Sequence, residues 1–261
     1  MTLKLVVLSD LHIVPMGETS LGLDTTARLR AGIAAINARH ADADLVVIAG
    51  DLADEGDTAS YLRLAATLPD LTPPLAMTIG NHDDRAAYLA VFGADQAGPT
   101  GFVDMVRDIK GYRIILLDSA IVPGRHDGRL EPEQLDWLAA CLAEAKDRPV
   151  IVVLHHHANP LRTAVDEIIL QNGAELVAVL REHPDVRQVI AGHVHYTSTA
   201  IWHGLPFTTL AGGHYSVTIP LDGSEPERLS GPGQMAVVLG DQDQTLVHFD
   251  NYHDDHAVLA D

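Results

Sequence analysis

Residues 45–51 read Leu45-Val46-Val47-Ile48-Ala49-Gly50-Asp51, and other parts of the chain repeat this pattern. Five consecutive apolar residues, two of them valine and one isoleucine, predict a strand that is buried on both faces. Gly50 allows the backbone to turn sharply, which leaves Asp51 where the strand ends. Ligands of open α/β sheets bind at the carboxyl ends of the strands, so Asp51 is a candidate functional group on a rigid scaffold.

Four further apolar runs end on Asp, Asn or His residues. They are residues 5–9 followed by Asp10-Leu11-His12, 75–80 followed by Asn81-His82-Asp83, 150–154 followed by His155-His156-His157, and 189–192 followed by His193-Val194-His195. Residues two apart in an extended chain point to the same side, so Asp10 and His12 can bind one ion together. Carboxylate, amide and imidazole groups are suitable ligands for Mn, Fe, Zn and similar divalent ions.

The composition is typical of an α/β protein without a membrane segment. A chain of 261 residues with 47% hydrophobic residues can form one large α/β domain or two small ones. No apolar run approaches the about 20 residues of a membrane helix, and residues 1–8 read as a strand rather than a signal peptide. We therefore expect a cytoplasmic protein with no membrane partner. Cys141 is the single cysteine, which excludes an intrachain disulfide and is consistent with a core position in a helix.

The formal net charge of −19 restricts the class of partner. Such a charge repels nucleic-acid backbones and anionic membranes, so we expect no nucleic-acid polymer as a partner. A small anionic substrate is compatible with this charge, because bound divalent ions would dominate the local field. The composition therefore favours a small-molecule ligand.

Helical periodicity and capping residues place helices between the strands. Asp24 precedes a helix over 25–39, and the strands on either side of this helix form a βαβ unit, so they should be parallel. Further helices are expected at 58–68, 85–93, 131–146 and 174–182, and a hairpin of strands at 102–107 and 112–117. Short strands after residue 197 predict antiparallel pairing. We infer one domain over 1–261 with two packed sheets, in which 216–261 packs on the core or on a neighbouring copy.

The motifs occur in the order Asp-x-His, Gly-Asp, Gly-Asn-His-Asp, His-His and Gly-His-x-His, each behind an apolar strand. In this order, from Asp10 to His195, they resemble the calcineurin-like metallophosphoesterase superfamily. The resemblance implies an α/β fold, a four-layer α/β/β/α sandwich of two packed mixed sheets flanked by helices, with a binuclear metal site at the strand carboxyl ends. Within the superfamily the chain is most similar to bacterial class III cyclic-nucleotide phosphodiesterases and the related glycerophosphodiesterases.

The resemblance implies two divalent ions and a ligand set for each. Asp10, His12 and His195 would hold one ion, and Asn81, His193 and one histidine of residues 155–157 would hold the other. Asp51 would bridge the two ions, because a carboxylate offers two oxygens and an imidazole does not. Two ions about 3.5 to 4 Å apart can clamp both sides of an in-line displacement. The identity of the ions stays open among Mn, Fe, Zn and Co.

The run His155-His156-His157 leaves the choice of ligand open. His155 takes the first position after the apolar strand and is the first candidate, and His156 is the second. Superfamily members usually have His-His-Pro or His-x-Pro here, whereas this chain has Ala158 and reaches a proline only at Pro160. The departure leaves the geometry of this turn open.

His82, next to Asn81, resembles a histidine that lies beside the ligands in the superfamily. Asp83 would orient its ring, as carboxylates commonly do for histidine. His82 and Asp83 are therefore the candidate catalytic residues, with His82 donating to a phosphate oxygen or protonating the leaving alcohol. Asn81, His82 and His156 are the candidates for contacts with the substrate.

The implied reaction is hydrolysis of a small phosphodiester by attack of a metal-bound hydroxide. The substrate would be a 3′,5′-cyclic nucleotide or a glycerophosphodiester. The alternatives are a phosphomonoesterase or nucleotide pyrophosphohydrolase on the same site, and a non-catalytic metal-binding scaffold. The resemblance also implies a homo-oligomer, a dimer or larger, formed through the C-terminal region.

Other polar residues have more ordinary interpretations. Asp54 and Glu55 are expected to be solvated or to cap the next helix, and Asp118 to end a strand. Arg125, His126 and Arg129 are candidates for binding the substrate, with an exposed loop as the competing interpretation. Surface positions are expected for His248, His253 and His256.

Overall fold

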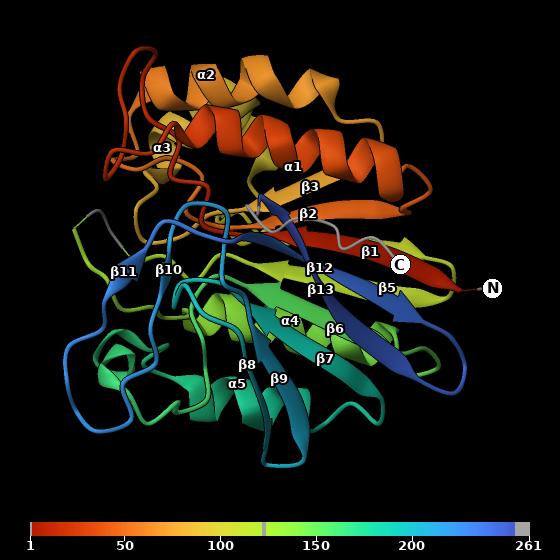
Figure 1. Ribbon diagram of the computed structural model, residues 1–261. Coiled ribbons are helices and arrows are strands. Elements are labelled where there is room, and N and C mark those ends of the chain that lie inside the picture. Colours follow the sequence, from red (N-terminus) through yellow and green to blue (C-terminus); the bar gives the residue numbers. More distant parts are fainter. Residues whose placement is uncertain (1, 122–123, 254–261) are drawn as a thin grey trace, which may run out of the picture.

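The computed structural model describes residues 2–121 and 124–253, which form four layers (Figure 1). Helices α1, α2 and α3 cover one face of the first sheet, the second sheet packs on its other face, and α4 and α5 cover the far side. The helices are α1 (Thr25–Arg39), α2 (Thr58–Thr67), α3 (Arg85–Phe92), α4 (Pro132–Glu144) and α5 (Gly173–Leu180), with short 3-10 turns η1 (Leu68–Asp70), η2 (Ala94–Gln96) and η3 (Ala164–Ile168). The four-layer prediction is confirmed.

The first sheet has the order β13-β12-β1-β2-β3, and the second has the order β4-β5-β6-β7-β9-β8. Strands β1, β2 and β3 are parallel, whereas β12 is antiparallel to both β1 and β13. In the second sheet β5, β6, β7 and β9 are parallel, with antiparallel β4 and β8 at the edges. The bounds of the first sheet are β1 (Leu3–Leu8), β2 (Leu45–Ala49), β3 (Leu75–Thr78), β12 (Gly233–Gly240) and β13 (Thr245–His253). Those of the second are β4 (Met105–Ile109), β5 (Tyr112–Leu117), β6 (Val150–Leu154), β7 (Val186–Ala191), β8 (Ser198–Trp202) and β9 (Leu205–Thr209).

The central strands are buried on both faces, as their apolar runs predict. In β2, Val46 and Ile48 belong to the core under α1 and α2, whereas Leu45, Val47 and Ala49 belong to the core between the sheets. All five residues of β2 are buried. Alternate side chains point to opposite faces of a strand, so a strand between two cores needs an unbroken apolar run.

The helix starts follow the capping residues in the sequence. The carboxylates of Asp24, Asp57 and Asp84 accept a hydrogen bond from the backbone N–H three residues later, at the starts of α1, α2 and α3. The first and last residues of each predicted helix lie within two residues of the observed ones. Strand β4 begins three residues later than predicted, and the two-residue strand β11 (Arg228–Leu229), which pairs with β10 (Ser216–Val217), was not predicted.

The C-terminal strands join the first sheet rather than form a separate one. Residues of β12 pair with β1 from Leu3↔Gly240 to Val7↔Ala236. The side chains of His248 and His253 on β13 are exposed, as expected, whereas His256 lies outside the described residues. Among the described residues no helix is long and apolar enough to cross a membrane.

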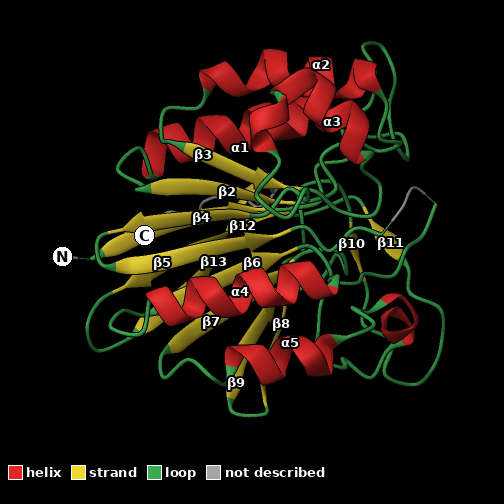
Figure 2. Ribbon diagram, turned by 180° about the vertical axis from the view of Figure 1, so that it is seen from behind, coloured by secondary structure: helices red, strands yellow, loops and turns green. Residues whose placement is uncertain are grey.

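The carboxyl ends of the parallel strands of both sheets lie at one edge of the molecule (Figure 2). The loops that carry the Asp, Asn and His motifs gather at this edge, and the β10–β11 hairpin lies there as well. Packing one sheet on the other thus brings together loops that are far apart in the sequence.

Candidate metal centre

The seven residues predicted as metal ligands are buried and lie together at this edge. They are Asp10, His12, Asp51, Asn81, His155, His193 and His195. Asp10, His12 and His195 each offer one ligand atom within 4.8 Å of the others, and so do Asp51, His155 and His193. The sequence therefore predicted two clusters that the fold does assemble.

In the first cluster, backbone or carboxylate acceptors fix both histidines through Nδ1. His12 Nδ1 donates to Asp54 Oδ1 at 2.9 Å, and His195 Nδ1 donates to the carbonyl oxygen of Tyr215 at 2.8 Å. The Nε2 atoms therefore face inward, 3.5 Å from Asp51 Oδ2 for His12 and 3.5 Å from Asp10 Oδ1 for His195. His12 Nε2 is buried without a hydrogen-bond partner among the described residues, which suits an atom that binds an ion.

In the second cluster, three acceptor atoms converge on Nε2 of His155. Asp51 Oδ1, Asn81 Oδ1 and His193 Nδ1 each lie 3.2 Å from it. The other nitrogens of the two rings are occupied, because His155 Nδ1 donates to the carbonyl of Ala49 at 2.9 Å and His193 Nε2 donates to the carbonyl of Ile168 at 3.0 Å. Two ligands that each lie about 2.1 Å from one ion are about 3.0–3.4 Å apart, so these spacings fit a shared ion.

Asp51 belongs to both clusters. Its Oδ2 faces His12 and its Oδ1 faces His155. The backbone N–H of His82 donates to the same Oδ1 at 3.0 Å, which holds the carboxylate in this orientation. A carboxylate with one oxygen turned to each cluster is the arrangement that a bridging ligand requires.

The electrostatics of the centre favour a cation. Burial lowers the pKa of His155, but the Asp51 carboxylate outweighs it and raises this pKa to about 9. Conversely, burial raises the pKa of Asp51, but His155 and the neighbouring histidines hold it well below its usual value. A buried site that favours the protonated form of His155 has a negative potential, and a negative potential also favours a bound cation.

Five of the candidate ligands have a left-handed backbone. Their φ angles are 55° for Asp10, 47° for His12, 50° for Asp51, 74° for His193 and 56° for His195. This conformation costs about 1 kcal/mol or more for each residue other than glycine. Strain of this kind concentrates at functional sites, and here it turns alternate side chains of the Asp-x-His and His-x-His loops into the centre.

The three consecutive histidines have different surroundings. His155 points into the second cluster, whereas His156 Nδ1 lies 2.8 Å from Ser119 Oγ, and its ring centroid lies 4.6 Å from that of His193. His157 Nε2 lies 3.6 Å from Asp166 Oδ1. The structure therefore brings the first candidate, His155, together with Asp51 and His193, whereas the second candidate, His156, contacts Ser119 and the ring of His193.

The prediction that Asp83 orients the His82 ring is wrong. His82 Nδ1 donates instead to the carbonyl oxygen of Asp54 at 2.6 Å. Asp83 is buried and accepts from the backbone N–H groups of Leu52, Ala53 and Gly80 and from the hydroxyl of Tyr61, at 2.9 to 3.0 Å. Asp83 therefore ties together the loops after β2 and β3, and its effect on the centre is one of position.

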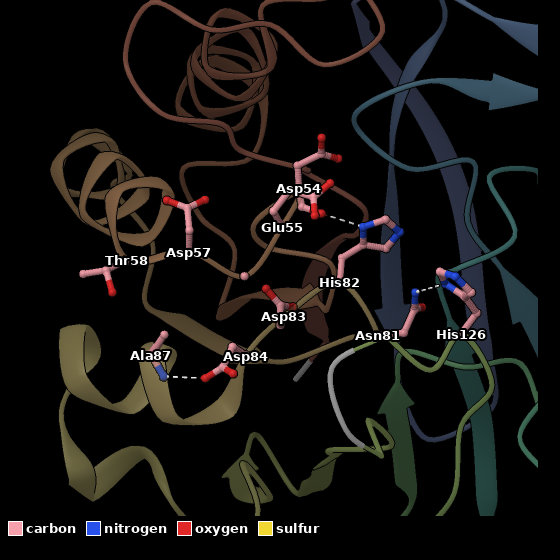
Figure 3. Close-up of a pocket in the computed structure, with 12 residues that line it drawn as sticks. Asp54, Glu55, Asp57, Thr58, Asn81, His82, Asp83, Asp84, Ala87 and His126 are labelled. Carbon is pink, nitrogen blue, oxygen red and sulfur yellow. Dashed lines mark hydrogen bonds between the residues drawn. The ribbon is translucent and has the colours of Figure 1, made fainter.

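A cleft of ≈ 650 Å³ opens beside His82 and Asn81 (Figure 3). Its walls carry the acidic side chains of Asp54, Glu55, Asp57 and Asp84, with His126 beside Asn81. Asn81 Nδ2 lies 3.4 Å from His126 Nδ1, so His126 is the one residue of the loop candidates at the cleft. Arg125 pairs with Asp127, and Arg129 lies 3.8 Å from Glu131. Asp118 is buried and pairs with Arg85, so it has a structural role, as expected.

Two residues near the centre were not predicted, and Asp54 was assigned too small a role. The Asp54 carboxylate orients His12, and its carbonyl orients His82. His214 lies 4.9 Å from His12 between ring centroids, and the Tyr215 ring stacks on His195 at 3.9 Å. Burial and the neighbouring His12 lower the pKa of His214 to about 3, so this ring is neutral. Residues 207–214 read Phe-Thr-Thr-Leu-Ala-Gly-Gly-His, a strand-like run followed by Gly-Gly-His, and this likeness to the other motifs could have been used to find His214.

Comparisons with known proteins agree with this geometry. The sequence profile of the family described as calcineurin-like phosphoesterase matches residues 3–197. A probable cyclic nucleotide phosphodiesterase of Rhodococcus erythropolis is 34% identical over 250 residues, which cover 94% of this chain and 81% of that protein. A probable glycerophosphodiester phosphodiesterase of Arcobacter nitrofigilis is 30% identical over 219 residues, 82% of this chain and 79% of that one. A dimetal phosphatase of Danio rerio has the same fold, with a TM-score of 0.68 at 17% identity over 94% of this chain and 98% of that one.

Proposed function

The chain belongs to the calcineurin-like phosphoesterase family of metal-dependent phosphoester hydrolases, and from this premise we propose a substrate and a role for each residue of the centre. The substrate is a small phosphodiester, either a 3′,5′-cyclic nucleotide or a glycerophosphodiester. The observation that carries the proposal is Asp51, which turns one carboxylate oxygen to each of two ligand clusters. A single structural ion would not need a ligand shared in this way.

We assign Asp10, His12, Asp51 and His195 to one divalent ion and Asp51, Asn81, His155 and His193 to the other. The oxygen and nitrogen donors suit Mn, Fe, Zn or Co. When bound, two such ions would lower the pKa of water and neutralise the charge of the phosphate. In the first cluster, His12 donates to the Asp54 carboxylate and His195 donates to the Tyr215 carbonyl, and these hydrogen bonds keep the ligand rings in place.

The acidic cleft supports a diester rather than a monoester. A phosphodiester has one negative charge at neutral pH, whereas a monoester has close to two. The carboxylates of Asp54, Glu55, Asp57 and Asp84 line the cleft and repel the second charge. The net charge of −19 acts in the same direction and disfavours a nucleic-acid polymer.

We assign to His82 the protonation of the leaving alcohol. Its Nδ1 donates to the Asp54 carbonyl at 2.6 Å, so Nε2 is the ring nitrogen left for the cleft, and it is the imidazolium form of His82 that donates a proton from Nε2 to the leaving alcohol. General acid catalysis of this kind contributes about 10²- to 10⁴-fold. Asn81 and His156 stay our candidates for further contacts with the substrate, with Asn81 at the cleft and His156 behind His193.

Replacing His82 with alanine is expected to lower kcat by about 10²-fold or more while both ions are retained. The loss should be smaller for a substrate with a p-nitrophenolate leaving group, because this group leaves without a proton. Steady-state rates combined with metal analysis of the purified variant test this. Loss of an ion from His82→Ala would make His82 a ligand and contradict the assignment.

The substrate class is tested by the ratio of two rates. In the presence of Mn²⁺, we expect kcat/KM for bis(p-nitrophenyl) phosphate to exceed that for p-nitrophenyl phosphate by at least about tenfold, or about 1.4 kcal/mol. The metal-stripped protein is the control and should hydrolyse neither compound. A preference for the monoester would identify a phosphatase, and hydrolysis of a nucleotide pyrophosphate alone would identify a pyrophosphohydrolase. Two bound ions without turnover of any of these would indicate a scaffold.

The location and assembly that we propose follow from the composition and the family resemblance. We propose a cytoplasmic homo-oligomer that has a small-molecule substrate and neither a membrane nor a nucleic-acid partner. The charge of −19 supports the absence of anionic partners. Light scattering after size-exclusion chromatography tests the assembly, and a monomer at physiological concentration would contradict it.

A further inference from the structure

A second cavity lies beside the metal centre and shares no lining residue with the cleft at His82. Its volume is ≈ 570 Å³, within the usual range of small-molecule sites. His193 and His195 form part of its wall, so a molecule in this cavity would lie next to both ligand clusters. The function proposed above leaves this cavity without a role.

The β10–β11 hairpin builds the outer wall of the cavity and is attached to the centre. The backbone N–H of Val217 donates to the carbonyl of His195 at 3.0 Å, and Val217 pairs with Arg228 across the hairpin. Arg228 is thereby placed over the ring of Tyr215, with its guanidinium carbon 5.6 Å from the ring centroid. The same Tyr215 ring stacks on His195, with ring centroids 3.9 Å apart. The position of Arg228 therefore depends directly on a ligand residue.

The walls of the cavity combine apolar surface with one cation and one anion. Val165, Ile168, Val194, Val217 and Pro226 supply the apolar surface. Arg228 and Glu225 both line the cavity and are exposed, and neither makes an ion pair within the described part of the chain. In a chain with 36 acidic and 17 basic residues, Arg228 has Tyr215 rather than a carboxylate as its neighbour, so its charge is not neutralised by an ion pair among the described residues.

We propose that this cavity binds the purine base of a nucleotide whose phosphate lies at the metal centre. The proposal rests on the proposed function and selects the nucleotide from its two substrate classes. A purine is planar and apolar on its faces, and its edge presents N7 together with O6 of guanine or the N6 amino group of adenine. Arg228 can donate to N7 and O6, and Glu225 can accept from an amino or ring N–H. A glycerophosphodiester head group has neither the flat apolar faces nor this edge.

Binding of AMP and of ribose 5-phosphate to the Mn²⁺-loaded protein tests the proposal, because the two compounds share the phosphate and sugar and differ by the base. Isothermal titration should give a Kd for AMP that is at least about tenfold lower than that for ribose 5-phosphate. Arg228→Ala should remove most of this difference, and Arg228→Lys should restore it only in part, because a lysine can donate to N7 of adenine but lacks the planar guanidinium that can also stack on the base. Arg181→Ala changes another exposed arginine outside both cavities and should leave the ratio unchanged.

Equal affinity of the wild-type protein for the two compounds would overturn the proposal, and so would an unchanged AMP preference in Arg228→Ala. Retained Mn²⁺ content and an unchanged Kd for ribose 5-phosphate show that the variant is folded. The binding experiment and the hydrolysis experiment can fail independently of each other. A protein that hydrolyses bis(p-nitrophenyl) phosphate but has no preference for AMP contradicts only the base site. A protein that prefers AMP but hydrolyses no diester contradicts only the proposed reaction.

Discussion

Asp51→Ala is expected to lower kcat/KM by at least about 10³-fold, or about 4 kcal/mol of transition-state stabilisation. The reason is that Asp51 is the residue shared by the two clusters, with Oδ2 facing His12 and Oδ1 facing His155. Its removal takes a ligand and a negative charge from each ion at once. Metal analysis after dialysis should show fewer than two ions per chain, and kinetics with bis(p-nitrophenyl) phosphate should show the loss of rate.

Two variants control this experiment. Asp51→Asn keeps the size of the side chain and one oxygen, so it should retain more metal than Asp51→Ala but still lose most of the rate. Asp70→Ala removes an exposed aspartate from the turn after α2 and should change neither quantity. A near-normal rate with two ions bound in Asp51→Ala would refute the binuclear centre.

His155→Ala is expected to lose one of the two ions and to lower kcat/KM by at least about 10²-fold, or about 2.7 kcal/mol. Three acceptor atoms lie 3.2 Å from His155 Nε2, so the substitution removes one donor atom from the point where these groups meet. His156→Ala should retain both ions and mainly slow turnover, because His156 contacts Ser119 and His193 rather than the ligand atoms. Ion stoichiometry and rate are measured on both variants in parallel.

The pair of variants serves as its own control, since both remove a buried imidazole from the same turn. Loss of general stability would affect them alike, whereas the ion count should separate them. If His156→Ala lost an ion and His155→Ala kept both, the ligand assignment would have to be exchanged.

Much of the fold could be predicted because buried strands require apolar runs and helix starts require capping residues, and both can be recognised in the sequence. The apolar run before Asp51 is required by a strand between two cores, and Asp24 is required by the start of α1. The order of the strands could not be predicted for β12. Met235 and Val237 pack toward α1, and Ala236 and Val238 pack between the sheets, so the same run would fit a central position in either sheet.

The ligand residues could be predicted more readily than the groups that hold them in place by hydrogen bonds. A metal ligand needs a particular side chain, whereas its hydrogen-bond partner is often a backbone carbonyl, which every residue has. His82 is oriented by the carbonyl of Asp54, and His155 by that of Ala49. The prediction that Asp83 orients His82 is wrong for this reason, because Asp83 is only the neighbour in sequence and the actual partner, the Asp54 carbonyl, lies in the loop after β2.

The pairing of β12 with β1 has a consequence for synthesis of the protein. Strand β1 lies in the middle of the first sheet, yet one of its two neighbours is made only after the entire second sheet. Until then β1 has an open edge of apolar residues on the nascent chain, and such edges invite pairing with other chains. We therefore expect a chaperone that covers residues 3–8 during translation to raise the yield of folded protein. It should have little effect on the stability of the protein once β12 has paired with β1. A chain cut short before residue 233 would keep all seven predicted ligands but leave the β1 edge without its β12 partner, so we expect it to aggregate.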